Sequence, residues 1–347
     1  MSITRSEIFG QYAALKQTLD CVAEQEKAIV EFFNGASPRR LLFTGCGSSY
    51  ALACSFRAIA SLWSDIPVFA VPAGDLWRNF EEYKRLFDGA LVLSVSRSGE
   101  TSELINAYKT IRAAAPCTRF VSINCREDST IAELSDFTIS MPWAFDESVC
   151  QTRCVCCLYT AGMLTLAKML GKADADEGFQ KVAQNGPAFL ERNDGTLRDL
   201  SKNPWNSVVV LADGPVEGLA DEAALAFKEI SCLQSNYYHV LDVRHGPIVL
   251  IDDKTLVMVL AGGRFGEYEK ALVEEIAAKG ALVAVCSELP FDIAGVKANI
   301  WFGERVGNLA NGLILAAACQ LASLYKSKIN GCDPDRPEGL KPWIELK

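Results

Sequence analysis

The stretch LVLSVSRSGETSEL, residues 91–104, contains an apolar strand pattern, a Ser/Gly turn and the start of a helix. In open parallel sheets, ligands bind at the carboxyl ends of strands, where helix N-termini offer unpaired N–H groups and a partial positive charge. Ser96, Ser98 and Thr101 add hydroxyl donors there, and Gly99 lets the backbone approach a ligand closely. The stretch therefore predicts a phosphate site. The alternative is an ordinary helix cap, with Ser98 capping and Glu100 in the first turn.

A second Ser/Gly turn, TGCGSSY at residues 44–50, follows the first expected strand. We expect it to lie beside the first turn, because neighbouring parallel strands end at the same edge of a sheet. Gly47, Ser48 and Ser49 are its candidate phosphate-binding residues.

Strands rich in Val, Ile and Leu alternate with helical patterns along the chain, which is typical of parallel sheets covered on both faces. The expected strands are residues 40–45, 68–71, 90–95, 119–124, 137–141, 207–212, 237–241, 255–261, 282–287 and 299–302. The expected helices are residues 49–62, 100–114, 149–170, 216–232, 267–279 and 309–326. The predicted fold class is α/β: two duplicated, doubly wound αβα sandwiches, each with a mainly five-stranded parallel sheet.

The two halves of the sequence can be overlaid. LLF at residues 41–43 falls on VVV at 208–210, and RSGE at 97–100 falls on RFGE at 264–267. Small hydroxyls around the turn of the first copy are replaced by rings or non-donors in the second, so only the first copy is expected to bind an anion. The expected domains are an N-terminal helical segment (1–30), a phosphate-binding domain (31–171), a linker (172–200), a catalytic domain (201–330) and a C-terminal tail (331–347).

The composition restricts the possible functions. A net charge of -9 argues against nucleic acid as a partner, and 2 histidines leave little for a multi-histidine metal site. We expect no metal, no cofactor, no membrane span and no signal peptide. The 13 cysteines, odd in number and mostly in apolar segments, predict reduced thiols in a cytosolic protein. The run Cys154, Cys156 and Cys157 is interpreted as buried helix packing.

Five segments, TGCGSSY, SVSRSGET, ESVCQTR, FKEIS and VRHGP, occur in an order that resembles tandem sugar-isomerase (SIS) domain enzymes. This family includes the isomerase part of glucosamine-6-phosphate synthase and the fructosamine-6-phosphate deglycases. The resemblance implies that the sugar phosphate is held by Gly47, Ser48, Ser49, Ser96, Ser98 and Thr101. Arg97 stands where the synthase has Gln, and an arginine there would suit a phosphate.

The segment FKEISCLQSNYYHVLDVRHGP, residues 227–247, carries the candidate acid–base pair. Taken alone, Glu229 fits a solvated helix residue and His245 fits a turn. The resemblance instead implies that Glu229 is the base that moves a proton between sugar carbons and that His245 opens the ring. Asp242 either orients His245 or forms the turn. His239 lies in an apolar strand pattern and is expected to pack structurally.

Two further segments are assigned by the resemblance. Glu147 and Val149 lie in its ligand-loop signature and are expected to line the sugar site, although a helix N-cap is equally compatible with their sequence. The tail is expected to fold over the site and bring Lys341 to it, whereas its composition alone fits a frayed terminus.

These observations support three functions. The first is a deglycase or deaminase that cleaves the C–N bond of an amino-linked hexose 6-phosphate. The second is an aldose–ketose isomerase, and the third is a non-catalytic phosphosugar-binding protein. Synthase-type isomerases carry a lysine three residues before the catalytic Glu, where this chain has Ala226, which favours the first. The SIS pattern starts within about 40 residues, so we expect no glutaminase part. The expected partners are a sugar phosphate and a second copy of the chain, in a homodimer or larger homo-oligomer.

Overall fold

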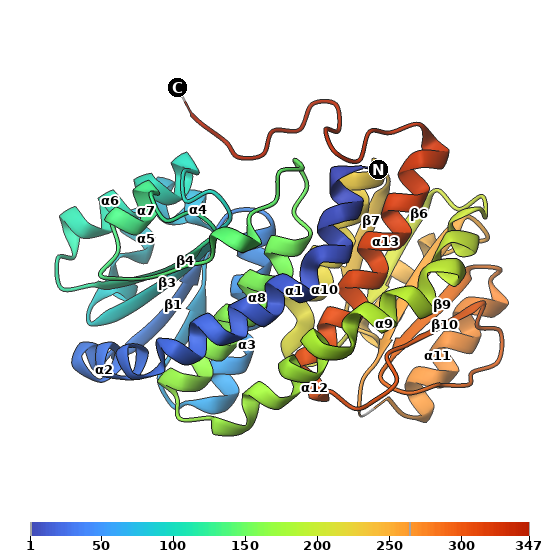
Figure 1. Cartoon of the computed structure of the whole chain (residues 1–347), viewed down its shortest axis with the longest axis horizontal. Coiled ribbons are helices and arrows are strands. Elements are labelled where there is room, and N and C mark those ends of the chain that lie inside the picture. Colours follow the sequence, from blue (N-terminus) through green and yellow to red (C-terminus); the bar gives the residue numbers. More distant parts are fainter. Residues whose placement is uncertain (1, 264, 347) are drawn as a thin grey trace. The chain divides into compact units, whose positions relative to one another are not determined.

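The computed structural model describes residues 2–263 and 265–346. Its strands form two separate five-stranded parallel sheets (Figure 1). The α/β class and the two parallel sheets that the sequence predicts are therefore confirmed. Arg264, which the overlay aligns with Arg97, lies outside the described residues.

The described chain divides into two compact units that differ from the expected serial domains. The first-sheet unit contains Ala13–Asp146, Arg153–Asp176 and the tail from Lys341. The second-sheet unit contains the chain up to Tyr12, Glu147–Thr152 and Glu177–Leu340. Each unit thus includes short segments from distant parts of the sequence. Local composition does not reveal such segments, which is why contiguous boundaries were expected.

The first sheet has helices on both faces, because successive side chains of a strand point to opposite sides. On one face Leu42, Val92 and Phe120 pack against α6 in a buried cluster. On the other face the ring of Phe43 lies 6.0 Å from that of Phe56 in α3. In sheet order the strands are β2 (Val68–Ala70), β1 (Arg40–Thr44), β3 (Ala90–Ser96), β4 (Arg119–Asn124) and β5 (Phe137–Ser140). The helices are α2 (Glu26–Ala36), α3 (Ser48–Trp63), α4 (Ala73–Arg78), α5 (Phe80–Tyr83), α6 (Ser102–Ala114), α7 (Thr130–Glu133) and α8 (Arg153–Met169), with 3-10 turns η1 (Lys84–Phe87), η2 (Pro142–Ala144) and η3 (Ala173–Ala175).

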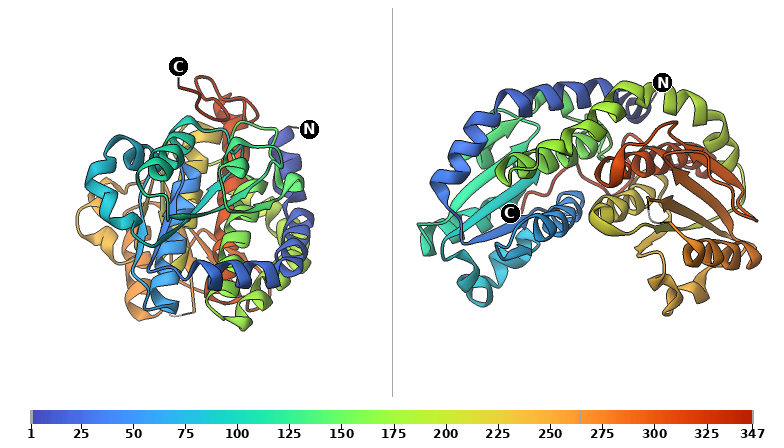
Figure 2. Two further views of the ribbon diagram at one scale, coloured as in Figure 1. Left: turned by 90° about the vertical axis from the view of Figure 1, so that its left-hand side faces the viewer. Right: turned by 90° about the horizontal axis from the view of Figure 1, so that it is seen from below.

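The second sheet is covered in the same way (Figure 2). Val209, Val257 and Val283 pack against α11 on one face, and α10 and α13 contact strands β6, β8 and β9. In sheet order the strands are β10 (Ala298–Trp301), β9 (Leu282–Ser287), β8 (Thr255–Ala261), β6 (Ser207–Leu211) and β7 (Gln234–Tyr238). The helices are α9 (Asp176–Ser201), α10 (Glu217–Ser231), α11 (Glu267–Ala278), α12 (Gly307–Ala310) and α13 (Gly312–Asn330), with 3-10 turns η4 (Gly214–Val216), η5 (Asp242–Arg244) and η6 (Pro247–Leu250); α1 (Ile3–Glu24) begins in this unit.

One helical stretch among the described residues, 307–330, is long and apolar enough to span a membrane by length and composition alone. Of its most apolar window, 83% is buried inside the protein. This burial is typical of a core helix, which passes the same test.

Candidate active site

The loop after β1 belongs to the first-sheet unit and leads directly into α3. Gly45 has no room for a side chain, because an added Cβ would lie 2.7 Å from the Ser49 backbone. Gly47 takes a positive φ of 54° at the helix start. Ser48 and Ser49 form the first helical turn and are 4% and 5% exposed. The loop therefore places two buried hydroxyl residues and the positive end of the α3 dipole at the end of β1.

The loop after β3 lies at the same edge, because β1 and β3 pair in parallel with Thr44 opposite Ser94. Ser96 Oγ accepts the Gly99 N–H at 3.0 Å, and Ser98 Oγ accepts the Glu100 N–H at 3.1 Å. Each hydroxyl accepts a bond from its own loop and keeps its proton to donate to a ligand. Ordinary capping is thus not the arrangement found: Thr101 holds the N-cap position of α6, without a side-chain cap bond.

Arg97 connects this loop to the C-terminal tail. Its side chain is almost fully buried and its guanidinium donates to the Pro342 carbonyl. Two residues further on, the Ile344 carbonyl accepts the Ser102 N–H at 3.1 Å, and the Leu346 N–H donates to Ser102 Oγ at 2.9 Å. The tail therefore lies against the loop after β3, while Lys341 beside Pro342 is exposed.

The electrostatics of these loops favour an anion. The Glu100 carboxylate accepts both the Thr130 N–H and the Thr130 hydroxyl at 2.8 Å, which directs its charge to α7. Burial, with a smaller contribution from Glu103, raises the pKa of the Cys46 thiol to about 12, so this thiol stays neutral. Arg97 and the positive ends of the α3 and α6 dipoles lie at these loops, together with the Glu103 carboxylate in the first turn of α6. Such an arrangement suits a phosphate dianion.

The loop that carries Glu147 and Val149 belongs to the second-sheet unit. The helix expected from residue 149 begins only at Arg153, so neither residue is its N-cap. The backbone of the loop is held by side chains and carbonyls instead, since the Glu7 carboxylate accepts the N–H groups of Glu147 and Ser148. Glu147 is exposed and Val149 half-buried.

Glu229 lies in the last turn of α10 and is half-buried. On the same turns, Ala226 and Ile230 form a buried cluster with Cys150 of the ligand loop. The second-sheet unit thus brings the loop and the Glu229 helix together. Ala226 is 2% exposed and its carbonyl accepts the Ser323 hydroxyl. The place where synthase-type enzymes carry lysine is therefore a packed apolar position.

The two histidines occupy different surroundings. His245 is exposed directly after η5, and its N–H donates to the Asp242 carbonyl at 2.9 Å, so Asp242 forms the turn. His239 does not pack in the core, contrary to the prediction. Its side chain is 47% exposed, with Nδ1 at 3.2 Å from Asp213 and Nε2 at 3.6 Å from Glu217. The apolar neighbours Tyr238 and Val240 suggested a strand interior, but β7 ends at Tyr238.

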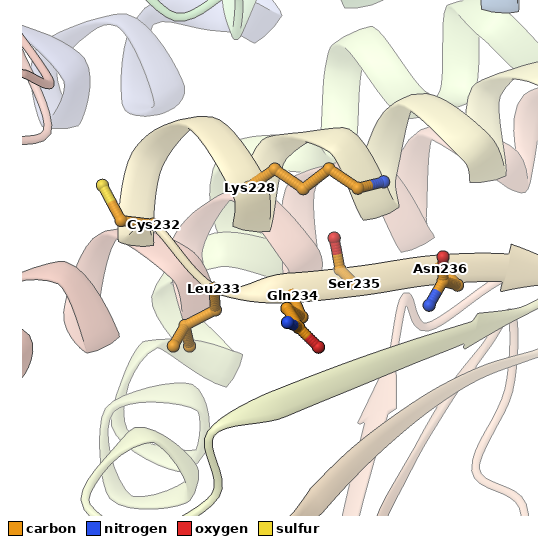
Figure 3. A pocket seen from close by; sticks show the side chains of 6 residues that line it. All are labelled: Lys228, Cys232, Leu233, Gln234, Ser235 and Asn236. Carbon is orange, nitrogen blue, oxygen red and sulfur yellow. The ribbon is translucent and has the colours of Figure 1, made fainter. Parts of the chain in front are cut away.

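A pocket of about 480 Å³ opens beside the end of α10 (Figure 3). Its lining is Lys228, Cys232, Leu233, Gln234, Ser235 and Asn236. None of the predicted site residues is among them. Among the described residues, no group of three or more His, Cys, Asp or Glu side chains could hold a metal ion.

Two residues that bind these loops, Glu7 and Pro342, were not predicted from the sequence. Glu7 lies on the buried face of α1 and is 3% exposed, and Pro342 supplies the carbonyl that Arg97 binds. Glu7 had a signal in the sequence: together with Thr4 and Gln11 it forms a polar stripe at helical spacing where core residues are expected. The Pro342 carbonyl had none, because a backbone acceptor has no sequence signature.

Comparisons with known proteins find similarity in sequence and in fold. Residues 36–158 match the family model of the SIS domain. Glutamine–fructose-6-phosphate aminotransferase (isomerizing) of Caulobacter vibrioides is 27% identical over 329 residues, which are 89% of this chain and 52% of that protein. The chain thus spans about half the length of the curated relatives it matches.

Two solved structures extend the likeness to the whole chain. Glucosamine-6-phosphate deaminase of Thermotoga maritima superposes with a TM-score of 0.84 and 25% identity, covering 99% of this chain and 100% of that one. Tagatose-6-phosphate ketose/aldose isomerase of Escherichia coli gives a TM-score of 0.84 at 22% identity, covering 100% and 96%, and shares the fold. Residues 36–158 thus contain a SIS domain, and the chain as a whole is similar in sequence and fold to phosphosugar enzymes.

Proposed function

We propose that this protein cleaves the C–N bond of an amino-linked hexose 6-phosphate, releasing an amine and a hexose 6-phosphate. The observation that carries the proposal is the packed Ala226 one helical turn before Glu229, which leaves a carboxylate without the lysine of synthase-type isomerases. The likeness to a glucosamine-6-phosphate deaminase over nearly the whole of both chains supports the same chemistry.

In the proposed reaction, the buried hydroxyls and N–H groups around Ser49 and Ser98, with Arg97, bind the phosphate and orient the sugar chain. Glu147 and Val149 line the sugar. Glu229 removes a proton from the amine-bearing carbon next to the carbonyl of the open-chain sugar, which gives an enaminol. Return of the proton to the neighbouring carbon gives an imine. Water adds to the imine carbon, and the C–N bond breaks as the amine nitrogen takes a proton. No metal or cofactor takes part.

His245 has the role of ring-opening acid, since an imidazole can both donate and accept a proton. It is exposed and is followed by Val249 and Leu250, which are 77% and 75% exposed. Two adjacent bare apolar side chains favour a protein contact. The active form in this proposal is a homodimer in the cytosol, where a second copy covers this turn.

The equal strand orders of the two sheets support an origin by duplication. In the first unit the order is β2-β1-β3-β4-β5, and in the second β7-β6-β8-β9-β10 is the same order shifted by five. In this proposal the copies have divided their roles. The first retained the phosphate loops and the second acquired Glu229 and His245.

The test is a screen of glycated amino acid 6-phosphates and glucosamine 6-phosphate, with amine and hexose 6-phosphate measured separately. Wild type should release both in equal amounts. Glu229→Gln should lower kcat by about 10²–10⁴-fold, because it removes the base but keeps the shape. Glu191→Gln, an exposed position on α9, is the matched control. Interconversion of sugar phosphates without amine release would favour the isomerase. Full activity of the Glu229 variant would contradict the mechanism.

A further inference from the structure

A buried carboxylate holds the ligand loop of the second-sheet unit from one side. Glu7 Oε1 accepts the Glu147 N–H at 2.6 Å and the Ser148 N–H at 3.1 Å, and Oε2 accepts the Ser148 hydroxyl. The Glu7 side chain is 3% exposed. Burying a carboxylate is costly unless donors compensate its charge, and here three donors from two consecutive residues do so. The Glu7 carboxylate therefore fixes the backbone of the loop at residues 147 and 148.

The same loop is held from the other side by the segment that leads into the tail. The Val149 N–H donates to the Asp335 carbonyl at 3.0 Å. The Asp335 carboxylate in turn accepts the N–H groups of Ile3 and Thr4 at 2.9 and 2.8 Å, at the start of α1. Burial alone would raise the pKa of Asp335, but these bonds outweigh it and lower the pKa, so Asp335 is ionised at neutral pH.

These contacts join three distant segments. Glu7 lies one helical turn after Ile3 and Thr4, whose N–H groups Asp335 accepts. The first two turns of α1 therefore connect Glu7 and Asp335, the two residues that bind the loop. Glu147 is exposed while its own N–H is fixed, which leaves its side chain available to a ligand. A loop whose backbone is bound at three successive residues presents its side chains in one conformation.

We propose that Glu7 is a positioning residue: it sets the conformation of residues 147–149 so that this loop recognises the sugar part of the phosphosugar. This role rests on the proposed function for the identity of the ligand. Glu7 does not touch substrate; it acts through the loop. Its loss should weaken recognition of the sugar and leave recognition of the phosphate group unchanged, because the phosphate loops belong to the first-sheet unit.

The experiment compares binding of glucose 6-phosphate and of inorganic phosphate by calorimetry on the full chain. Glu7→Ala should raise the Kd for glucose 6-phosphate by about 10–100-fold, the loss expected for hydrogen bonds to a charged acceptor. The Kd for inorganic phosphate should stay within about twofold. Glu7→Gln keeps an oxygen for the two N–H groups and should restore part of the affinity. Glu24→Ala, an exposed position on the same helix, is the control.

The ratio of the two dissociation constants separates positioning from general damage. Equal weakening of both ligands, or unchanged binding of both in Glu7→Ala, would overturn the proposal. If Glu7→Ala does not fold, the ratio is read in Glu7→Gln, where a wild-type value likewise overturns it. Because binding needs no turnover, the result stands apart from the C–N cleavage assay, which can fail while the binding ratio still changes.

Discussion

The conformation of the loop between β3 and α6 depends on Gly99. It has a φ of 65°, and an added Cβ would lie 2.4 Å from Ser129 Oγ. Gly99→Ala therefore has to move either its own backbone or residue 129. We expect the variant to lose about 1–3 kcal/mol of unfolding free energy and to bind inorganic phosphate at least about tenfold more weakly. Chemical denaturation and calorimetry measure the two effects.

Gly35→Ala is the control for this substitution. Gly35 lies in α2, and an added Cβ there meets nothing within 4 Å. Alanine is favoured over glycine in a helix by up to about 1 kcal/mol, so this variant should be neutral or more stable. Equal behaviour of the two variants would show that the strain argument for Gly99 is wrong.

Lys326 is a buried cation whose nearest described partners are uncharged. It is 4% exposed, its amine donates to the Asn203 carbonyl at 2.8 Å, and it lies 4.2 Å from the Trp205 ring centre. Burial lowers the pKa of Lys326 below 10.5. The unfolded chain then holds this proton more tightly than the folded one, so the free energy of unfolding rises with pH between the lowered pKa and 10.5.

Lys326→Met should remove this pH dependence. The free energy of unfolding of wild type minus that of Lys326→Met should increase from pH 8 to pH 11, as followed by urea denaturation. Lys328→Met, at an exposed position of the same helix, should keep the wild-type slope. A difference between wild type and Lys326→Met that stays constant with pH would refute the assignment.

Among the secondary-structure elements, the bounds of buried strands were predicted more accurately than those of an edge strand. The predicted bounds of β4, β8 and β9 are those observed, and all three strands are buried over nearly their whole length. The edge strand β7 is three residues earlier than predicted, at Gln234–Tyr238. Its sequence QSNYY is polar because it pairs with β6 alone, and an edge strand tolerates polar side chains.

Helix starts depend on partners that are remote in sequence. The Glu100 carboxylate is bound by Thr130, so α6 begins at Ser102 instead of residue 100. The N–H groups of residues 147–149 bond to Glu7 and Asp335, so α8 begins four residues later than its apolar pattern suggests. The loops after β1 and β3 could be singled out as a candidate phosphate site because their hydroxyl residues and glycines are adjacent in sequence. The contacts of Glu7 and Asp335 with residues 147–149 could not be predicted in this way, because both residues are more than 130 positions away in sequence.

At the scale of the whole molecule, the proposed homodimer makes its own prediction. Val249→Asp with Leu250→Asp places two charges on the bare apolar pair after His245, and should convert the dimer into a monomer of about 37.8 kDa. Because both side chains are exposed, the variant should keep its melting temperature within a few degrees. Light scattering after gel filtration measures the mass.

Ile329→Asp controls for the loss of an exposed apolar side chain as such. Ile329 is 54% exposed on α13, away in sequence from the His245 turn, and its variant should remain dimeric. A wild-type protein that is monomeric at micromolar concentration, or a double variant that stays dimeric, would contradict the proposed interface.

The contact between the tail and the phosphate loop has a consequence for the order in which the protein matures. The hydrogen bond between the Ser102 hydroxyl and the Leu346 N–H joins residues 244 positions apart, and the guanidinium of Arg97 likewise needs the distant Pro342 carbonyl. At a synthesis rate of about 5–20 residues per second, roughly 10–50 s separate the translation of the two sides. The apolar core of the first sheet can form in that interval, but the loop after β3 gains the carbonyls of Pro342 and Ile344 only after residues 342–344 have left the ribosome. A chain still being translated therefore has to fold its first sheet without the contacts that residues 342–346 later supply.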